Sequence, residues 1–221
     1  MKVRIHEELD DVLRVGVLRL RDLRLPDDDG AALWRLIDGR SAEIEAEHRG
    51  KSSGQIPAVG ETRKLYRAVG IDPTKTRPSS EALLRRVIKG KGLYRVHPLV
   101  DMCNLVSLES QLSLGLYDES RIAGDEVTVR IGEPGWGFEG IRRGPINVGG
   151  RLCVADAAGP FGSPTADSQR TCIEGPAERA LVIVFQHQDG ELARLEAALY
   201  HARDLAGEHL VLVGHGRMGL S

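Results

Sequence analysis

Three polar side chains recur at every third position in an otherwise apolar stretch, residues 98 to 108. They are Asp101, Asn104 and Ser107. In a helix this spacing places a carboxylate, an amide and a hydroxyl on one face. The stripe could line a pocket and orient a substrate or a water molecule. Alternatively, it could tie a buried helix to neighbouring backbone, because buried polar groups need hydrogen-bond partners. His97 directly precedes the stretch and is a candidate general base or a helix cap.

A second set of candidates lies in a long polar loop that follows a predicted strand at 151–155. This loop contains Asp156, Asp167 and Arg170. Long loops on a β scaffold are frequent locations for functional sites. The three charged residues could form a turn-stabilising ion pair or the floor of a pocket.

A basic segment spans residues 61–95 and is masked by the overall net charge of −2. Its pattern predicts helices at about 61–69 and 79–89, the second opened by Ser79 as a cap with Glu81 in its first turn and closed by Gly90. The cations near the end of this segment could contact RNA phosphates or form a solvated face. They are Arg85, Arg86, Lys89, Lys91 and Arg95.

The composition excludes several classes of protein. The 221 residues suit one main domain, and an aromatic content of 4% leaves few rings for a base-stacking platform. Three cysteines far apart, without metal-ligand spacing, predict a reducing compartment and neither a metal nor another cofactor. No apolar run suits a signal peptide or a membrane span, so we expect a cytoplasmic protein.

The remaining pattern indicates a mixed fold. A half-buried strand is expected at 12–20 and a helix at about 31–48, followed by a mobile linker around residues 49–57, which divides the chain into an extension, 1–55, and a main domain, 56–221. The stretch 114–125 is rich in turn residues, and 132–140 is predicted to be a hairpin turn that exposes Trp136. Short strands at 127–131, 151–155 and 181–185, an amphipathic helix with Leu192 on its apolar side, and a strand at 209–213 complete the prediction.

An ordered set of segments resembles the B3/B4 domain of the phenylalanyl-tRNA synthetase beta subunit, and more closely the stand-alone proteins built from that domain. The resemblance covers about residues 56–187. Its segments are GIDPTKTRPSSEALLRRVIKGKGL, YRVHPLVDMCNLVSLESQLSLGLYD, RIAGDEVTVR, RLCVAD and LVIVF. It implies an α+β fold with a β-rich, partly open barrel-like core and helical insertions. It also implies hydrolysis of a mischarged aminoacyl-tRNA ester, a reaction that removes products a synthetic site cannot reject.

Some of the synthetase's functional residues have a match in this sequence, and others do not. Asp101 and Asn104 match an aspartate and an asparagine of the synthetase, and Asp118 matches a further aspartate. Gly115 stands where the synthetase usually has a histidine. The glycine-rich editing stretch of the synthetase, which includes a functional glutamate, has no clear match after Asp156.

These observations lead to three hypotheses, of which the first two are the main ones. The first is a protein that binds tRNA or aminoacyl-tRNA, but neither DNA nor a membrane, and hydrolyses a mischarged ester. Its catalytic candidates are His97, Asp101, Asn104 and Asp118, and its substrate-binding candidates are Ser107, Gly115, Asp156, Asp167 and Arg170. The second is a non-catalytic RNA-binding or amino-acid-sensing module. The third is hydrolysis of an amide or ester that is not attached to RNA.

Overall fold

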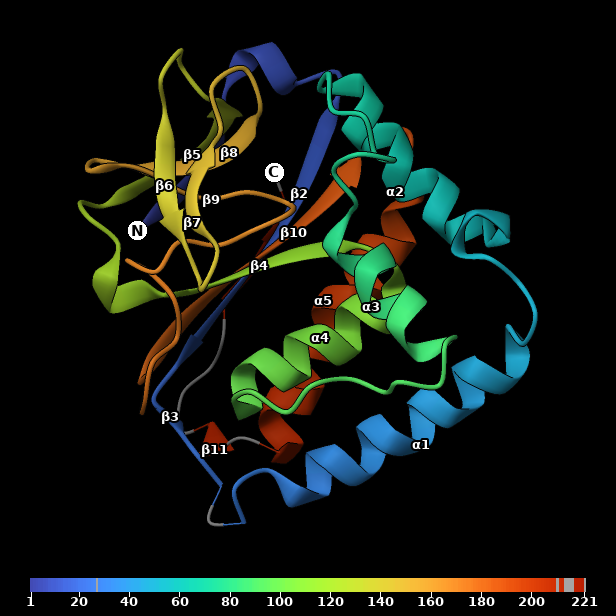
Figure 1. Cartoon of the computed structure of the whole chain (residues 1–221). Helices are drawn as coiled ribbons and strands as arrows, with labels where there is room; N and C mark the ends of the chain where they lie inside the picture. The colour runs from blue at the N-terminus through green and yellow to red at the C-terminus, as the bar shows by residue number, and fades with distance from the viewer. Residues whose placement is uncertain (27, 210, 213–216, 221) are drawn as a thin grey trace.

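The computed structural model describes residues 1–26, 28–209, 211–212 and 217–220. Strands and helices occur in separate runs along the chain, which is an α+β arrangement, as predicted. Figure 1 shows α1, α3, α4 and α5 on one side of the long strands and β5, β6, β7, β8 and β9 on the other. The helices are α1 (Ala31–Glu47), α2 (Pro57–Ala68), α3 (Ser79–Val87), α4 (Pro98–Ser110) and α5 (Leu192–His209), with 3-10 turns η1 (Glu7–Leu9), η2 (Ser53–Gln55) and η3 (Glu119–Arg121).

Two four-stranded sheets carry most of the strands. The order in the main sheet is β12-β2-β10-β4, and the order in the second sheet is β1-β5-β8-β9. Among the described residues neither sheet closes into a barrel, which agrees with the expected open core. The strands are β1 (Lys2–Ile5), β2 (Leu13–Arg21), β3 (Leu23–Arg24), β4 (Ser113–Asp118), β5 (Glu126–Ile131), β6 (Gly137–Gly140), β7 (Gly144–Asn147), β8 (Leu152–Asp156), β9 (Gly159–Gly162), β10 (Arg179–His187), β11 (Val211–Leu212) and β12 (Arg217–Leu220).

Strand β10 lies in the middle of the main sheet and pairs antiparallel with both β2 and β4. Successive side chains of a strand point to opposite faces. Val182 and Val184 therefore pack against the helices, whereas Ile183 and Phe185 pack against the second sheet. Both faces of β10 are thus covered by apolar side chains, which explains why its sequence is a continuous apolar run.

Strand β2 corrects the prediction of a half-buried strand. Leu18 and Leu20 join the cluster beneath the helices, and Val15 and Val17 join the cluster beneath the second sheet. All four side chains are buried. Their roughly alternating pattern arises because Arg14 and Arg19 interrupt a strand that is covered on both faces.

Helix α4 is buried on nearly every side, as its apolar sequence predicts. Its Leu99 and Met102 share a cluster with Leu33 and Ile37 of α1, and α5 packs along the same helix. Thus α1, although it belongs to the first 55 residues, contributes to the same core as α4. The division of the chain at residue 55 stays a prediction. Leu192, which was expected on the apolar face of α5, is 42% exposed instead.

Several local predictions were wrong for identifiable reasons. The first part of the stretch predicted to be rich in turns, residues 114–118, belongs to strand β4, because β10 offers it a hydrogen-bonding edge, whereas residues 119–125 do form η3 and bends of the chain. The predicted mobile linker contains η2, where the buried Ser53 hydroxyl donates a hydrogen bond to Glu81. Ser79 does not cap α3, since its hydroxyl donates to the Pro164 carbonyl.

Two further expectations concern the hairpin and the C-terminal end. Trp136 is half-buried, and the Arg130 guanidinium lies 5.0 Å from its ring centre. Of the strand expected at 209–213, β11 is described and pairs with β3, whereas residues 210 and 213 lie outside the described residues. No helix within the described part of the chain is long and apolar enough to cross a membrane.

Tyr117 connects the two sheets. It is fully buried on β4, and its ring meets that of Phe161 on β9 edge to face at 4.8 Å. A side-chain carbon added at Gly115 or at Gly162 would overlap the Tyr117 ring and hydroxyl. The ring therefore passes between the backbone at Gly115 and the backbone at Gly162. Only glycine, which has no side chain, allows this close approach.

We expect Gly115→Ala to lower the free energy of unfolding by about 1–3 kcal/mol, since an enclosed ring cannot move away from the added methyl group. Gly39→Ala is the matched control. Gly39 lies in α1 with nothing near its missing side chain, so the same change should stabilise the protein by about 0.5–1 kcal/mol. Urea unfolding of both variants tests this prediction, and a Gly115→Ala variant as stable as the wild type would contradict it.

Candidate functional site

A pocket of about 130 Å³ lies between α4 and the loop 163–167. Helix α4 supplies Asn104 and Ser107, and the loop supplies Asp167. The first turns of α3 form a further wall through Ser79 and Leu83. The fold thus brings together three residues that the sequence analysis selected from two separate segments.

The loop that carries Asp167 is held in place by its own polar groups and by two helices. The Ser163 hydroxyl accepts hydrogen bonds from the backbone of Thr165 and Ala166. The Pro164 carbonyl accepts one hydrogen bond from the Tyr66 hydroxyl at 2.9 Å and another from Ser79. The pocket wall is therefore fixed before any ligand binds.

Asp167 is the acidic group of this pocket. Burial raises its pKa to about 7, because a charged carboxylate is poorly solvated there. The Tyr117 hydroxyl and the Leu116 backbone lie beside it and partly oppose this rise. Burial also raises the pKa of Tyr117 well above 10, so its hydroxyl stays neutral. A carboxyl group that is about half ionised at neutral pH can accept or release a proton there.

The three polar residues of α4 do not share one role: some form structural hydrogen bonds, and others line the pocket. Asp101 has a structural role, because it accepts hydrogen bonds from Trp34 Nε1 at 2.8 Å and from the Val96 backbone at 3.0 Å. Burial raises its pKa. Ser107 borders the pocket but donates to the Leu112 carbonyl at 2.7 Å. The half-buried Asn104 lines the pocket, and its amide makes no hydrogen bond with another described side chain or backbone group.

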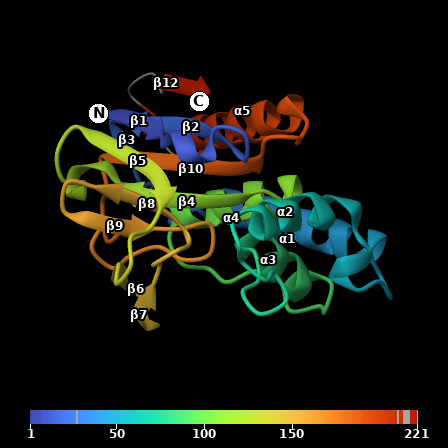
Figure 2. The same cartoon turned by 90° about the horizontal axis from the view of Figure 1, so that it is seen from above.

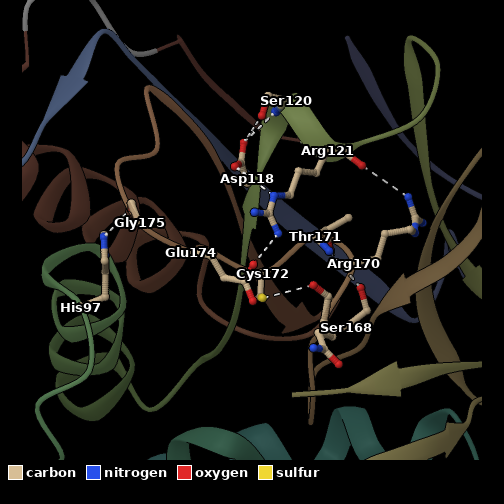
Figure 3. A network of polar contacts seen from close by, with 11 residues as sticks. His97, Asp118, Ser120, Arg121, Ser168, Arg170, Thr171, Cys172, Glu174 and Gly175 are labelled. Carbon is tan, nitrogen blue, oxygen red and sulfur yellow. Dashed lines mark hydrogen bonds and ion pairs between the residues drawn. The ribbon is translucent and has the colours of Figure 1, made fainter. Parts of the chain in front are cut away.

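His97 caps the start of α4 and lies outside the pocket. Its Nδ1 accepts a hydrogen bond from the Leu99 backbone at 3.2 Å, and its Nε2 is 3.1 Å from the Gly175 carbonyl (Figure 3). Burial lowers the pKa of His97 and favours the neutral ring. With both nitrogens engaged, the ring anchors the loop around Gly175 to α4.

Asp118 also lies apart from the pocket. It caps η3 by accepting hydrogen bonds from the backbone and hydroxyl of Ser120, and Arg121 approaches it at 3.6 Å (Figure 3). Arg121 in turn pairs with Glu174. The structure therefore does not bring Asp118 and His97 to the pocket that contains Asn104.

Asp156 and Arg170 form an ion pair with two hydrogen bonds, of 2.8 and 2.9 Å. Asp156 also accepts a hydrogen bond from the Ala123 backbone at 2.7 Å. Of the two interpretations left open for this loop, the turn-stabilising ion pair thus describes Asp156 and Arg170. Asp167, in contrast, forms part of the pocket.

Gly115 borders the buried Tyr117 ring, which occupies the space that a side chain at position 115 would need. Sequence reasoning missed Tyr117 as the neighbour of Asp167. It also missed Ser79, Ser163 and Thr165 as pocket residues. Tyr117 could have been found from its spacing of two after Gly115 in a strand, which places both on one face.

Four of the basic residues, Arg85, Arg86, Lys89 and Lys91, lie at or just beyond the C-terminal end of α3, and Arg95 lies shortly before α4. Not all of them are free. Arg86 lies 3.6 Å from the centre of the Tyr94 ring and donates to the Lys91 carbonyl. Arg95 pairs with Asp29. Within the described ranges Lys89, Lys91 and the half-buried Arg85 make no ion pair, and both lysines are exposed.

These features define an α+β protein with a small polar pocket, bordered by a helix whose other end is basic. The family model of the B3/4 domain matches residues 61–194. The chain therefore belongs to the B3/4 domain family, as its sequence resemblance predicts.

Two further comparisons give limited information. An N-terminal fragment of the phenylalanyl-tRNA synthetase beta subunit from Pyrococcus horikoshii aligns with a TM-score of 0.49 and 12% identity. The alignment covers 98% of this chain and 50% of the fragment, so the chain spans half the fragment's length. A search of curated proteins found no match.

The raised pKa of Asp167 predicts a specific dependence of stability on pH. The folded protein keeps a proton that the unfolded chain releases between the ordinary pKa of 3.8 and about 7. The free energy of unfolding should therefore fall as the pH rises through this interval. Asp167→Asn should remove this part of the fall, whereas Asn in place of the exposed Asp38 should not. Urea unfolding from pH 4 to pH 8 tests this, and parallel curves for wild type and Asp167→Asn would contradict it.

Proposed function

We propose that this protein binds aminoacyl-tRNA and hydrolyses the ester of a mischarged amino acid in the pocket between α4 and the loop 163–167. One observation carries the proposal. A carboxyl group with a pKa of about 7 faces a pocket that also contains an amide without a hydrogen-bond partner among the described residues, Asn104. Membership of the B3/4 domain family and the resemblance to the synthetase domain support a function related to tRNA.

The pocket residues suit the steps of ester hydrolysis. Ionised Asp167 accepts a proton from a water molecule as the water attacks the ester carbonyl carbon. The Asn104 amide donates a hydrogen bond to the oxyanion that forms. Asp167 then returns the proton to the ribose oxygen as the ester bond breaks, which releases the amino acid and the tRNA. Tyr117 stays neutral beside Asp167.

The size and position of the pocket agree with this use. A protein cavity of about 150 Å³ is large enough to bind benzene, so about 130 Å³ suits an amino-acid side chain. Helix α3 borders the pocket at Ser79, carries Arg85 and Arg86 in its last turn, and is followed by Lys89 and Lys91. At 1.5 Å per residue its nine residues separate these two ends by about 12 Å. One rigid helix thus joins a site for the aminoacyl group to a site for RNA phosphates.

A deacylation time course with a set of correctly charged and mischarged tRNAs tests the catalytic proposal. We expect the protein to accelerate hydrolysis of one or a few species, with a rate that rises as the pH passes through about 7. Asp167→Asn should lower the rate about 100-fold or more, since general-base catalysis contributes at least this factor. Asp38→Asn is the matched control. A fully active Asp167→Asn variant would overturn the assignment of the base.

Binding of uncharged tRNA tests the basic end of α3 separately. Lys89→Ala with Lys91→Ala should weaken binding and reduce the slope of log K against log salt by about 1.8, or 0.9 for each phosphate that a lysine no longer neutralises. Lys2→Ala, at an exposed position on β1, should leave the slope unchanged. Arg86 is a poorer choice, because removing it would also release Tyr94 and the loop at Lys91. An unchanged slope in the double variant would remove these lysines from the interface.

A non-catalytic binding module is the second candidate function. Two observations favour it: Tyr117 fills the space at Gly115, where the synthetase usually has a histidine, and His97 is engaged at both nitrogens. Such a module would bind tRNA without accelerating deacylation of any species. Hydrolysis of small esters that tRNA does not inhibit would instead support an enzyme that acts on a substrate other than RNA.

A further inference from the structure

The hairpin of β6 and β7 carries an exposed basic turn. Four residue pairs form the hairpin, from Gly137 opposite Asn147 to Gly140 opposite Gly144. The turn consists of Ile141, Arg142 and Arg143, and all three residues are exposed. Figure 2 shows β6 and β7 projecting away from the long strands.

This turn lies directly beside the pocket loop. The Ile141 backbone donates a hydrogen bond to the Asp167 carbonyl at 3.3 Å, and the Gln169 backbone donates to the Glu139 carbonyl at 2.8 Å. Gly140 forms a bridge with Ser168 between these two bonds. Asp167 and Ile141 are therefore opposite residues of an antiparallel pair, and Arg142 follows one residue later. The acid of the pocket and the basic turn belong to one hydrogen-bonded unit.

The two arginines differ from three other arginines of this region, although the exposed Arg151 likewise makes no ion pair with a described residue. Arg121, Arg130 and Arg170 each pair with a carboxylate. Arg142 and Arg143 make no ion pair with any residue in the described ranges. Arg142 also adopts a φ of +55°, a left-handed conformation in which glycine or asparagine is less strained. The geometry of the turn therefore does not explain the presence of arginine there.

From this arrangement we infer that Arg142 and Arg143 bind the phosphates next to the 3′ end of the RNA whose ester enters the pocket. The inference rests on the proposed function and adds a second RNA contact. An ester on a terminal ribose can reach Asp167 only if the adjoining phosphates lie close to the pocket mouth. Guanidinium groups match phosphates with paired hydrogen bonds. The lysines at the far end of α3 would then contact the RNA farther from its 3′ end.

The test compares intact uncharged tRNA with the same tRNA lacking its three 3′-terminal nucleotides. For intact tRNA, Arg142→Ala with Arg143→Ala should raise Kd about tenfold and reduce the salt slope by about 1.4, the value for two phosphates of a single strand. For the shortened tRNA, wild type and variant should bind within twofold of one another. Arg35→Ala with Arg67→Ala, at exposed helical positions without ion pairs among the described residues, is the matched control.

The outcomes separate this inference from the function on which it rests. Equal losses of affinity for both RNAs, or no loss for either, would overturn the assignment of the turn to the 3′ end while leaving tRNA binding in place. A wild-type protein that binds neither RNA would overturn the proposed function and this inference together. Thermal unfolding of the double variant at the wild-type temperature excludes a folding defect as the cause of weaker binding.

Discussion

The packing of Tyr117 between two glycines is the constraint on which the site depends. The ring extends from the main sheet to β9, and it can do so only because Gly115 and Gly162 have no side chains. Its contact with Phe161 lies in the apolar cluster between the two sheets. Its neutral hydroxyl lies beside Asp167 in a buried environment, where a carboxylate loses solvation. The same packing therefore connects the sheets and adjusts the acidity of the pocket.

A buried ion cluster at the start of α3 supports the opposite wall of the pocket. Burial alone would raise the pKa of Glu81, but hydrogen bonds from Arg63 and Ser53 outweigh it and hold the pKa below its usual range. Arg63 lies on α2 and Ser53 in η2, so three segments meet at one carboxylate. Removing one partner of such a pair leaves a buried charge unsatisfied, which is costly. The cluster thus fixes α3, and with it both Ser79 at the pocket and the basic residues beyond it.

Much of the fold could be predicted because local signals agreed with tertiary packing. Pro98 and the apolar run after it marked the start of α4, and the β-branched run at 181–185 marked β10. The errors occurred where a distant partner decided the structure. Strand β4 exists because β10 lies beside it, and η2 is ordered because Glu81 lies behind it. Neither partner is visible in the local sequence.

The site, like the fold, could be predicted only in part from the local sequence. Asn104, Ser107 and Asp167 were each selected from the sequence, but only the fold shows that α4 and a loop some sixty residues later form one pocket. His97 and Asp118 carried equally strong chemical signals, yet their side chains are engaged in capping hydrogen bonds. Residue type and spacing identified candidates. The available hydrogen-bond partners decided which of them face a pocket.

The most direct test of the proposed site is a crystal structure with a hydrolysis-resistant aminoacyl-adenosine analogue, in which an amide replaces the ester. We predict that the aminoacyl group lies between α4 and the loop 163–167, with its carbonyl oxygen within hydrogen-bonding distance of the Asn104 amide and its carbonyl carbon facing Asp167. An analogue bound at another part of the protein, with this pocket unchanged, would contradict the assignment of the site.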